Sequence, residues 1–307
     1  MLSVLAVLAA ALLFGTTGTS QALGPEGTTP LSVGVMRMVI GGTVLAAIAF
    51  TLAARYRRNQ PHSPRLGIRP LALMVLTGAS LAAYQPLFFL GTARNGVAVG
   101  TVVALGSAPI LAGMLEWALT RRRPTATWML ATGLATVGVV LLGAGGEAGT
   151  GGGTDPMGLV GSVGAGATFA VIANAQRRLL DAGWDPFTVV GAMGACAAAI
   201  FACALPFVDV GWLAEPRGIA MALWLGLATI GVAYVLFTWG LSGLTAATAA
   251  TLTLAEPLTA SILGVVVLGE RLSPLAVTGL VVLAAGLALL ALGSRAPRDP
   301  GPFAVEA

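Results

Sequence analysis

The stretch TAATAATLTLAEPLTASILGVVVLGERL, residues 245–272, decides how this sequence folds. It is apolar and long enough to form a helix that crosses a membrane, but Glu256 lies in its middle. A charged residue there costs about 2.5–3.5 kcal/mol on insertion scales, so it is expected to face protein or water instead of lipid. Pro257 follows directly, frees the carbonyl of Thr253 and kinks the helix. The stretch therefore predicts a polar site within a bundle of membrane helices.

The composition indicates that the whole chain is a membrane protein. Of its 307 residues, 57% are hydrophobic and 9% are charged, and the mean hydropathy is +0.91. A soluble domain carries about 25% charged residues. The sixteen basic residues are all arginines, and all but Arg37 border the apolar runs, so they do not indicate a nucleic-acid partner. The predicted partner is the lipid bilayer.

At about 20 apolar residues per span, the chain divides into ten predicted transmembrane helices and is an all-α integral membrane protein. The short connections leave no room for a soluble domain. Residues 293–307 are rich in Pro, Gly and charge, and we expect a disordered tail there. The ten predicted spans are 2–22, 31–54, 71–91, 97–119, 126–144, 157–179, 187–208, 218–240, 246–268 and 274–292.

The placement of the arginines predicts the orientation. With the N-terminus inside, the inner loops and the tail hold twelve arginines, whereas the outer loops hold only Arg94, Arg217 and Arg271. This bias places both termini in the cytoplasm. The use of Arg without Lys, together with abundant Gly and Ala, suggests a GC-rich bacterial genome. The predicted location is therefore the bacterial inner membrane.

An internal repeat divides the chain into residues 1–145 and 156–292, joined by a Gly-rich outer linker at 146–155. Each copy holds five predicted spans, and because five is odd, the second copy enters the membrane inverted. Inverted repeats with helix breaks at matching prolines are typical of carriers that work by alternating access. A channel could share this symmetry, whereas a structural scaffold would not need it. The matched pairs are Phe14 with Phe169, Gln21 with Gln176, Tyr84 with Tyr234, Phe89 with Trp239, Pro109 with Pro257, and Gly138 with Gly286.

Several segments resemble the EamA-type transporters of the drug/metabolite transporter superfamily, and the similarity covers nearly the whole chain. The resemblance implies a ten-helix carrier of two inverted five-helix repeats that exports metabolites such as amino acids. The C-terminal half somewhat resembles the threonine/homoserine exporter branch. The chain departs from the family where Thr120–Pro124 replace a common LGE motif, and Ala108 stands opposite Glu256. The similar segments are FGTTGTSQAL (14–23), MRMVI (36–40), YQPLFFLGTARNGVAVGTVVALGSAPILAGMLEW (84–117), AYVLFTWGL (233–241) and AEPLTASILGVVVLGERLSPLAVTGLVVLAAGLAL (255–289).

Two charged residues within the spans are candidates for binding substrate. Arg37 has Gly34 and Gly41 on its helix face, so it either anchors an anion or fixes close packing. Glu256 binds a substrate amine, takes up a proton as coupling ion, or caps the half-helix after Pro257. The residues leave these roles open.

A set of polar and aromatic residues on symmetry-related spans is predicted to line a central cavity with them. Polar groups in the hydrocarbon region need partners or water, although any one of these side chains could simply join two helices, at about 0.6 kcal/mol on average. With the two charged residues, the predicted substrate-binding set is Arg37, Thr16, Gln21, Tyr84, Gln85, Asn174, Tyr234, Trp239 and Glu256, with Pro109 and Pro257 as hinges.

The sequence offers no support for an enzyme. Its one histidine, His62, lies in a predicted cytoplasmic loop, which disfavours a histidine-based metal site or triad, and no P-loop motif is present. We expect no cofactor, no metal and no catalytic residue.

The sequence thus predicts an efflux permease that exports amino acids or similar small amphipathic metabolites by alternating access. A flippase for lipid-linked substrates and an uptake carrier of the same fold remain alternatives. Proton coupling, facilitated diffusion and homodimerisation are left open.

Overall fold

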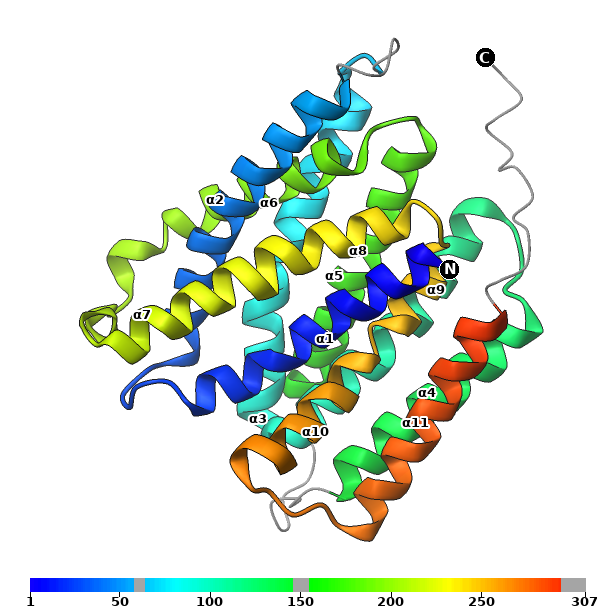
Figure 1. Ribbon diagram of the computed structural model, residues 1–307. Coiled ribbons are helices and arrows are strands. Elements are labelled where there is room, and N and C mark those ends of the chain that lie inside the picture. Colours follow the sequence, from blue (N-terminus) through cyan, green and yellow to red (C-terminus); the bar gives the residue numbers. More distant parts are fainter. Residues whose placement is uncertain (58–63, 146–154, 294–307) are drawn as a thin grey trace.

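A computed structural model describes residues 1–57, 64–145 and 155–293, and in these ranges the chain is helical without any strand (Figure 1). Nine of the described helices are long and apolar enough to cross a membrane. Three parts of the sequence prediction lie outside the described residues: His62, the predicted linker 146–155 except for its last residue, and the predicted tail beyond Gly293.

The first half contains four long helices. One of them, α3, joins the predicted third and fourth spans; as a straight helix of 53 residues it would be roughly 80 Å long, well over twice the thickness of a bilayer core. Gly96 interrupts it with φ 80° and ψ 157°, a conformation open to glycine. A methyl group at Gly100 would lie 2.7 Å from the backbone nitrogen of Thr92, so the two arms of α3 fold back on each other there. The helices are α1 (Leu2–Ala22), α2 (Pro30–Arg57), α3 (Ile68–Thr120) and α4 (Ala126–Gly145).

The second half has the same order of long helices but is more interrupted. The predicted span 218–240 is a continuous run of α7, η3 and α8 whose middle part, η3, is π-helical. The elements are α5 (Pro156–Asp181), α6 (Pro186–Ala202), η1 (Leu205–Phe207), η2 (Gly211–Ala214), α7 (Pro216–Leu223), η3 (Trp224–Val232), α8 (Ala233–Leu241), α9 (Ala246–Leu252), α10 (Ala255–Leu268) and α11 (Pro274–Gly293).

The predicted helix break beside Pro257 is confirmed, but a matching break beside Pro109 is wrong. The ninth predicted span divides into α9 and α10, and the Thr253 carbonyl accepts a 2.9 Å hydrogen bond from the backbone N–H of Glu256. In α3, Gly96 is the one residue with non-helical dihedral angles, and the helix continues through Pro109. Gly166 of α5 packs against this turn, since a methyl group there would lie 2.8 Å from the Ala104 carbonyl oxygen. We infer that this packing holds the helix regular.

Two helix pairs bring the halves of the chain together through glycine contacts. In the pair α4–α11, a methyl group at Gly138 would lie 2.7 Å from the Leu283 Cα, and one at Gly286 would lie 2.7 Å from the Ala135 nitrogen. The later residue of α4, Gly138, meets an earlier residue of α11 than Ala135 does, so the pair is antiparallel. The pair α2–α6 is antiparallel too, because Gly42 meets Ala198 whereas the later Ala49 meets Gly191. Figure 1 shows α11 beside α4, and α1 between α8 and α10.

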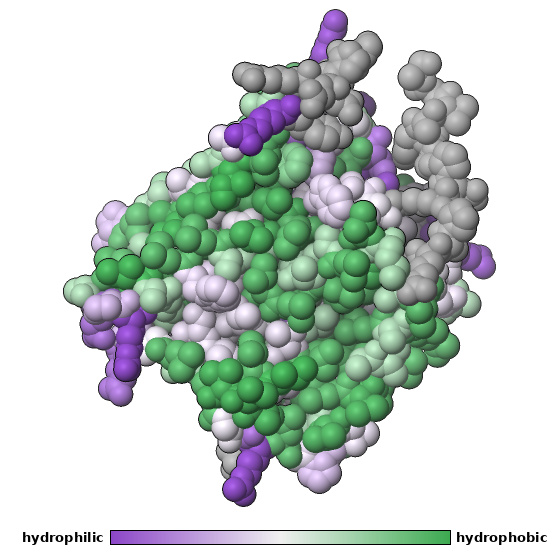
Figure 2. Space-filling view, viewed as in Figure 1, coloured by the Kyte–Doolittle hydropathy of each residue, from purple (hydrophilic) through white to green (hydrophobic). Residues whose placement is uncertain are grey.

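The outer surface is apolar as well as the interior. The main core includes Phe237, Met38 and Ile172, all less than 2% exposed. Large hydrophobic side chains such as Val266 are also exposed, at 75%. Figure 2 shows hydrophobic side chains over most of one face, with hydrophilic ones at its extremities. Such a surface suits contact with lipid, and the protein is a multi-pass membrane protein.

Candidate functional site

A cavity of about 460 Å³ lies inside the bundle, bordered by α1, α2, both arms of α3, α8 and the break between α9 and α10. It contains six of the nine predicted binding residues. It approaches the surface near the loop that joins α1 to α2, where Gln21 and Pro30 are exposed. The six predicted residues that line it are Arg37, Gln21, Tyr84, Gln85, Tyr234 and Glu256.

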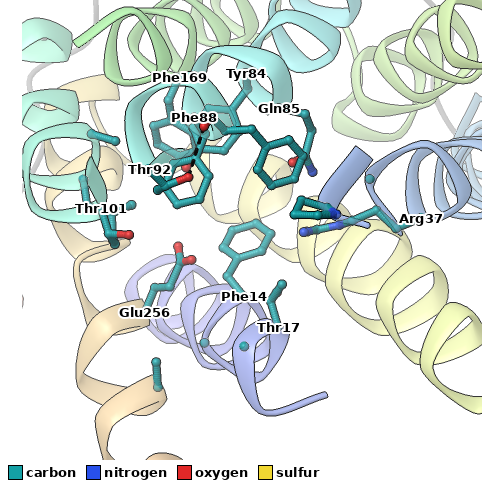
Figure 3. A pocket seen from close by; sticks show the side chains of 18 of the residues that line it. Phe14, Thr17, Arg37, Tyr84, Gln85, Phe88, Thr92, Thr101, Phe169 and Glu256 are labelled. Carbon is teal, nitrogen blue, oxygen red and sulfur yellow. Dashed lines mark hydrogen bonds between the residues drawn. The ribbon is translucent and has the colours of Figure 1, made fainter. Parts of the chain in front are cut away.

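Arg37 extends into this cavity from α2 (Figure 3). Its Nη2 donates a 3.3 Å hydrogen bond to the Thr229 hydroxyl, which itself donates to the Leu225 carbonyl at 2.6 Å. That hydroxyl proton is already used, so Thr229 can only accept from the guanidinium. The Nε of Arg37 is buried without a hydrogen-bond partner, and the described residues give Arg37 no ion pair. Arg37 is therefore a cation with unused donors at the cavity wall.

Glu256 lies on the opposite side of the cavity from Arg37, in the first turn of α10 (Figure 3). Among the described residues its carboxylate has no hydrogen-bond partner and no ion pair. The turn is fixed by close packing of α1, because a methyl group at Gly15 would lie 2.7 Å from the Glu256 carbonyl oxygen. The cavity thus has a cation on one side and a carboxylate on the other, with aromatic rings between them.

Aromatic rings form much of the remaining wall. Phe14 packs edge-on against Tyr234 with ring centroids 5.2 Å apart, and Tyr84 stacks on Phe88 at 5.8 Å. Phe88 was not among the predicted binding residues, although it follows Tyr84 by four residues and so shares its helix face. Phe169 was not predicted either, although the repeat pairs it with Phe14; both members of that pair line the cavity.

Three predicted binding residues do not reach this cavity. Thr16 donates to the Leu13 carbonyl and accepts from the indole N–H of Trp224, on another face of α1. The Asn174 amide donates to the Ala112 and Ala170 carbonyls at 3.1 and 2.9 Å and so joins α5 to α3. Trp239 is 39% exposed on the outside of the bundle. It follows Tyr234 by five residues, about 140° around the helix.

The end of the bundle where α9 begins is closed by polar contacts. The Glu116 carboxylate accepts a 2.7 Å hydrogen bond from the backbone N–H of Ala247, so it caps α9. Arg177 of α5 donates to the carbonyls of Leu241 and Leu244 at 2.9 and 3.1 Å. These bonds join α3 to α9, and α5 to the end of α8. Among the described residues, the exposed part of the cavity lining, which includes Gln21 and Pro30, lies at the opposite end of the bundle.

Comparisons with known proteins agree with this architecture. Residues 1–144 and 156–292 each match the EamA-like transporter family. The chain is 39% identical over 293 residues to a protein of Bacillus subtilis (strain 168) named "Uncharacterized transporter YwfM", covering 95% of this chain and 93% of that protein. A solved crystal structure with 21% identity shares the fold at a TM-score of 0.77, over 95% of this chain and 97% of the other.

Proposed function

The chain belongs to the EamA-like transporter family, and on that premise we propose that it is a secondary carrier of the bacterial inner membrane. Its substrates are amino acids or similar small amphipathic metabolites that carry both an anionic and a cationic group, and it exports them by alternating access. The family favours a transporter over an enzyme.

The observation that carries the substrate class is the pair Arg37 and Glu256. Each lines the same cavity from an opposite side, and neither has an ion-pair partner among the described residues. Burying an unpaired charge is costly, so a ligand that supplies a carboxylate to Arg37 and an ammonium group to Glu256 repays both costs. The rings of Phe14 and Phe88 then face the apolar part of the ligand. The volume of about 460 Å³ lies in the usual range for small-molecule sites.

We further propose that the chain crosses the membrane ten times as two inverted five-helix repeats. The two arms of α3 supply two of these crossings. Contacts that are equivalent under the repeat support the inversion: Gly138 meets Leu283 and Gly286 meets Ala135, and both partners differ by the same offset of 148 as the two glycines. Equivalent helices that pair antiparallel, as α4 and α11 do, belong to units of opposite orientation.

The proposed orientation, with both termini in the cytoplasm, follows from the arginine bias of the loops. In that orientation the cavity opens to the outside, and the bonds of Glu116 and Arg177 close the cytoplasmic end. The conformation is then the one from which an exporter releases its substrate. Rocking of the repeats, with Pro257 next to the break between α9 and α10 as a bending point, opens the other end. Glu256 is the candidate site for a coupling proton.

Export can be tested in a sensitive bacterial host that overexpresses the protein, by growth and by intracellular pool size. The test panel contains amino acids, their toxic analogues, and cationic drugs that lack a carboxylate. We expect resistance and a lowered pool for one or more amino-acid-like compounds, lost in Arg37→Gln and Glu256→Gln and retained in the surface control Arg271→Gln. Resistance to cationic drugs alone would contradict the substrate class. A raised pool would indicate uptake, and no effect from a protein present in the membrane would favour the flippase alternative.

A further inference from the structure

Two helix faces that line the central cavity continue past it towards the closed end of the bundle. Phe169 of α5, which Figure 3 labels, and Tyr234 of α8 lie at the cavity wall. Gln176 follows Phe169 by seven residues, nearly two full turns, so it shares that face of α5. Thr238 follows Tyr234 by four residues and likewise shares its face of α8. Since Arg177 joins the same two helices at the closed end, Gln176 and Thr238 lie between the cavity and that end.

Gln176 and Thr238 bond to each other, but the amide is poorly satisfied. Both side chains are fully buried, and neither lines the cavity. The Thr238 hydroxyl donates to the side-chain oxygen of Gln176 at 3.1 Å. The amide nitrogen of Gln176 donates to the Met193 sulfur at 3.2 Å, its one acceptor among the described residues. A thioether is a weak acceptor and the nitrogen carries two N–H donors, so this conformation leaves much of the cost of burying the amide unpaid.

The internal repeat relates this buried pair to residues of the open cavity. Gln176 is the counterpart of Gln21, and the offset of 150 that joins Tyr84 to Tyr234 makes Thr238 the counterpart of Phe88. Gln21 and Phe88 both line the cavity. In inverted repeats, a surface that one repeat presents to the outside is equivalent to a surface that the other presents to the inside. The cytoplasm-facing cavity is therefore expected to expose Gln176 and Thr238.

We propose that Gln176 and Thr238 separate when the carrier turns to the cytoplasm and form the site at which the substrate enters. The Gln176 amide N–H and the Thr238 hydroxyl then both donate hydrogen bonds to the substrate carboxylate. This inference rests on the proposed function and deepens it. It adds a neutral entry site, closed in the present conformation, to the charged site of Arg37 and Glu256.

Opening of the entry site can be tested without any substrate. In a background with Cys196→Ala and Cys203→Ala, which removes both native cysteines, Gln176→Cys and Thr238→Cys are treated with a membrane-impermeant methanethiosulfonate reagent. We expect both to react in inside-out membrane vesicles and not in right-side-out ones.

The matched control for this labelling is Thr132→Cys. Thr132 is also buried and bonds to Thr251 between α4 and α9, and its repeat counterpart, Leu280, does not line the cavity. The control should react from neither side. Gln176→Cys and Thr238→Cys that stay unreactive from the cytoplasmic side, or a control that reacts as they do, would overturn the proposal.

Binding of the substrate is tested with Thr238→Val, which keeps the shape of the side chain and removes its hydroxyl. The half-saturation concentration for amino-acid transport should rise about two- to tenfold from the cytoplasmic face, the effect of one lost hydrogen bond, and stay unchanged from the outer face. Thr132→Val should change neither value.

A purely structural bond between Thr238 and Gln176 predicts the opposite sign. Its loss would favour the cytoplasm-facing conformation and so lower the half-saturation concentration on that side. A lowered or unchanged value in Thr238→Val would therefore overturn the entry site. A wild-type protein that transports none of the amino acids would instead refute the proposed function, and the labelling would still decide whether Gln176 and Thr238 open to the cytoplasm.

Discussion

Replacement of Arg37 by glutamine separates a structural role of this residue from a role in binding substrate. In the ligand-free protein the guanidinium makes one long hydrogen bond, at 3.3 Å to Thr229, while its buried Nε has no partner. A hydrogen bond contributes about 0.5–1.5 kcal/mol, and a buried donor without a partner costs about 1–3 kcal/mol. Since the two effects oppose each other, the stability of the ligand-free variant should lie within about 1 kcal/mol of the wild type or above it.

Ligand binding should respond much more strongly to the same change. Hydrogen bonds to charged groups contribute about 1.5–3 kcal/mol, so loss of the pair between Arg37 and a substrate carboxylate should weaken the Kd roughly 10- to 150-fold. The assay is thermal unfolding in detergent with and without an amino acid of the test panel, together with equilibrium binding.

Matched analogues make the assignment specific. The amide of the amino acid lacks the carboxylate, and the N-acetyl derivative lacks the ammonium group. Wild-type protein should bind neither analogue. Arg37→Gln should no longer prefer the free amino acid to its amide. Glu256→Gln should no longer prefer the free amino acid to its N-acetyl derivative. A ligand-free variant that unfolds at a clearly lower temperature but binds the amino acid normally would refute the reasoning and make Arg37 a packing residue.

Two further predictions concern the contacts that hold the bundle together. Gly138→Ala should lower the free energy of unfolding by about 1–3 kcal/mol, because the added methyl group would meet the backbone of Leu283. The control Gly133→Ala has open space around the added methyl group and should leave the unfolding temperature unchanged. Equal effects of the two variants would contradict the packing argument. The hydrogen bond from Arg94 holds the pKa of Asp155 below its usual value, so the pair stabilises the fold at neutral pH and the gain is lost as pH falls through the lowered pKa. Asp155→Asn should therefore unfold at a lower temperature than wild type at pH 7, with a difference that disappears in acid, and a difference independent of pH would refute it.

The sequence predicted the positions of the long helices well, because each span must bury about 20 residues in hydrocarbon and this length is visible in the apolar runs. The bounds of α1 and α4 agree with the predicted spans to within a residue. The π-helical course of η3 was not predictable, since WLGLATIGV is as apolar as any regular span. Yet η3 supplies Thr229, the hydrogen-bond partner of Arg37.

The candidate site was predicted in part. Charges within apolar runs, Arg37 and Glu256, are expensive in lipid and so must point inward, which is why the sequence alone identifies them. An amide such as Asn174 is different, because a backbone carbonyl of a neighbouring helix satisfies it equally well, and the sequence does not specify which partner it takes. The break beside Pro257 and the continuous helix at Pro109 show the same limit. The cost of a proline is local, but the packing that opposes a break comes from another helix.

The most direct test of the central claim is amino-acid exchange in proteoliposomes that contain the purified protein. Vesicles loaded with an unlabelled amino acid of the panel should take up its radiolabelled form from outside, because a carrier with one alternating site exchanges substrate in both directions. The exchange should be abolished or strongly slowed in Arg37→Gln and Glu256→Gln and retained in Arg271→Gln. Exchange at the wild-type rate in both cavity variants would contradict the account, and so would a wild-type protein that exchanges compounds lacking one of the two charges as fast as the amino acid itself.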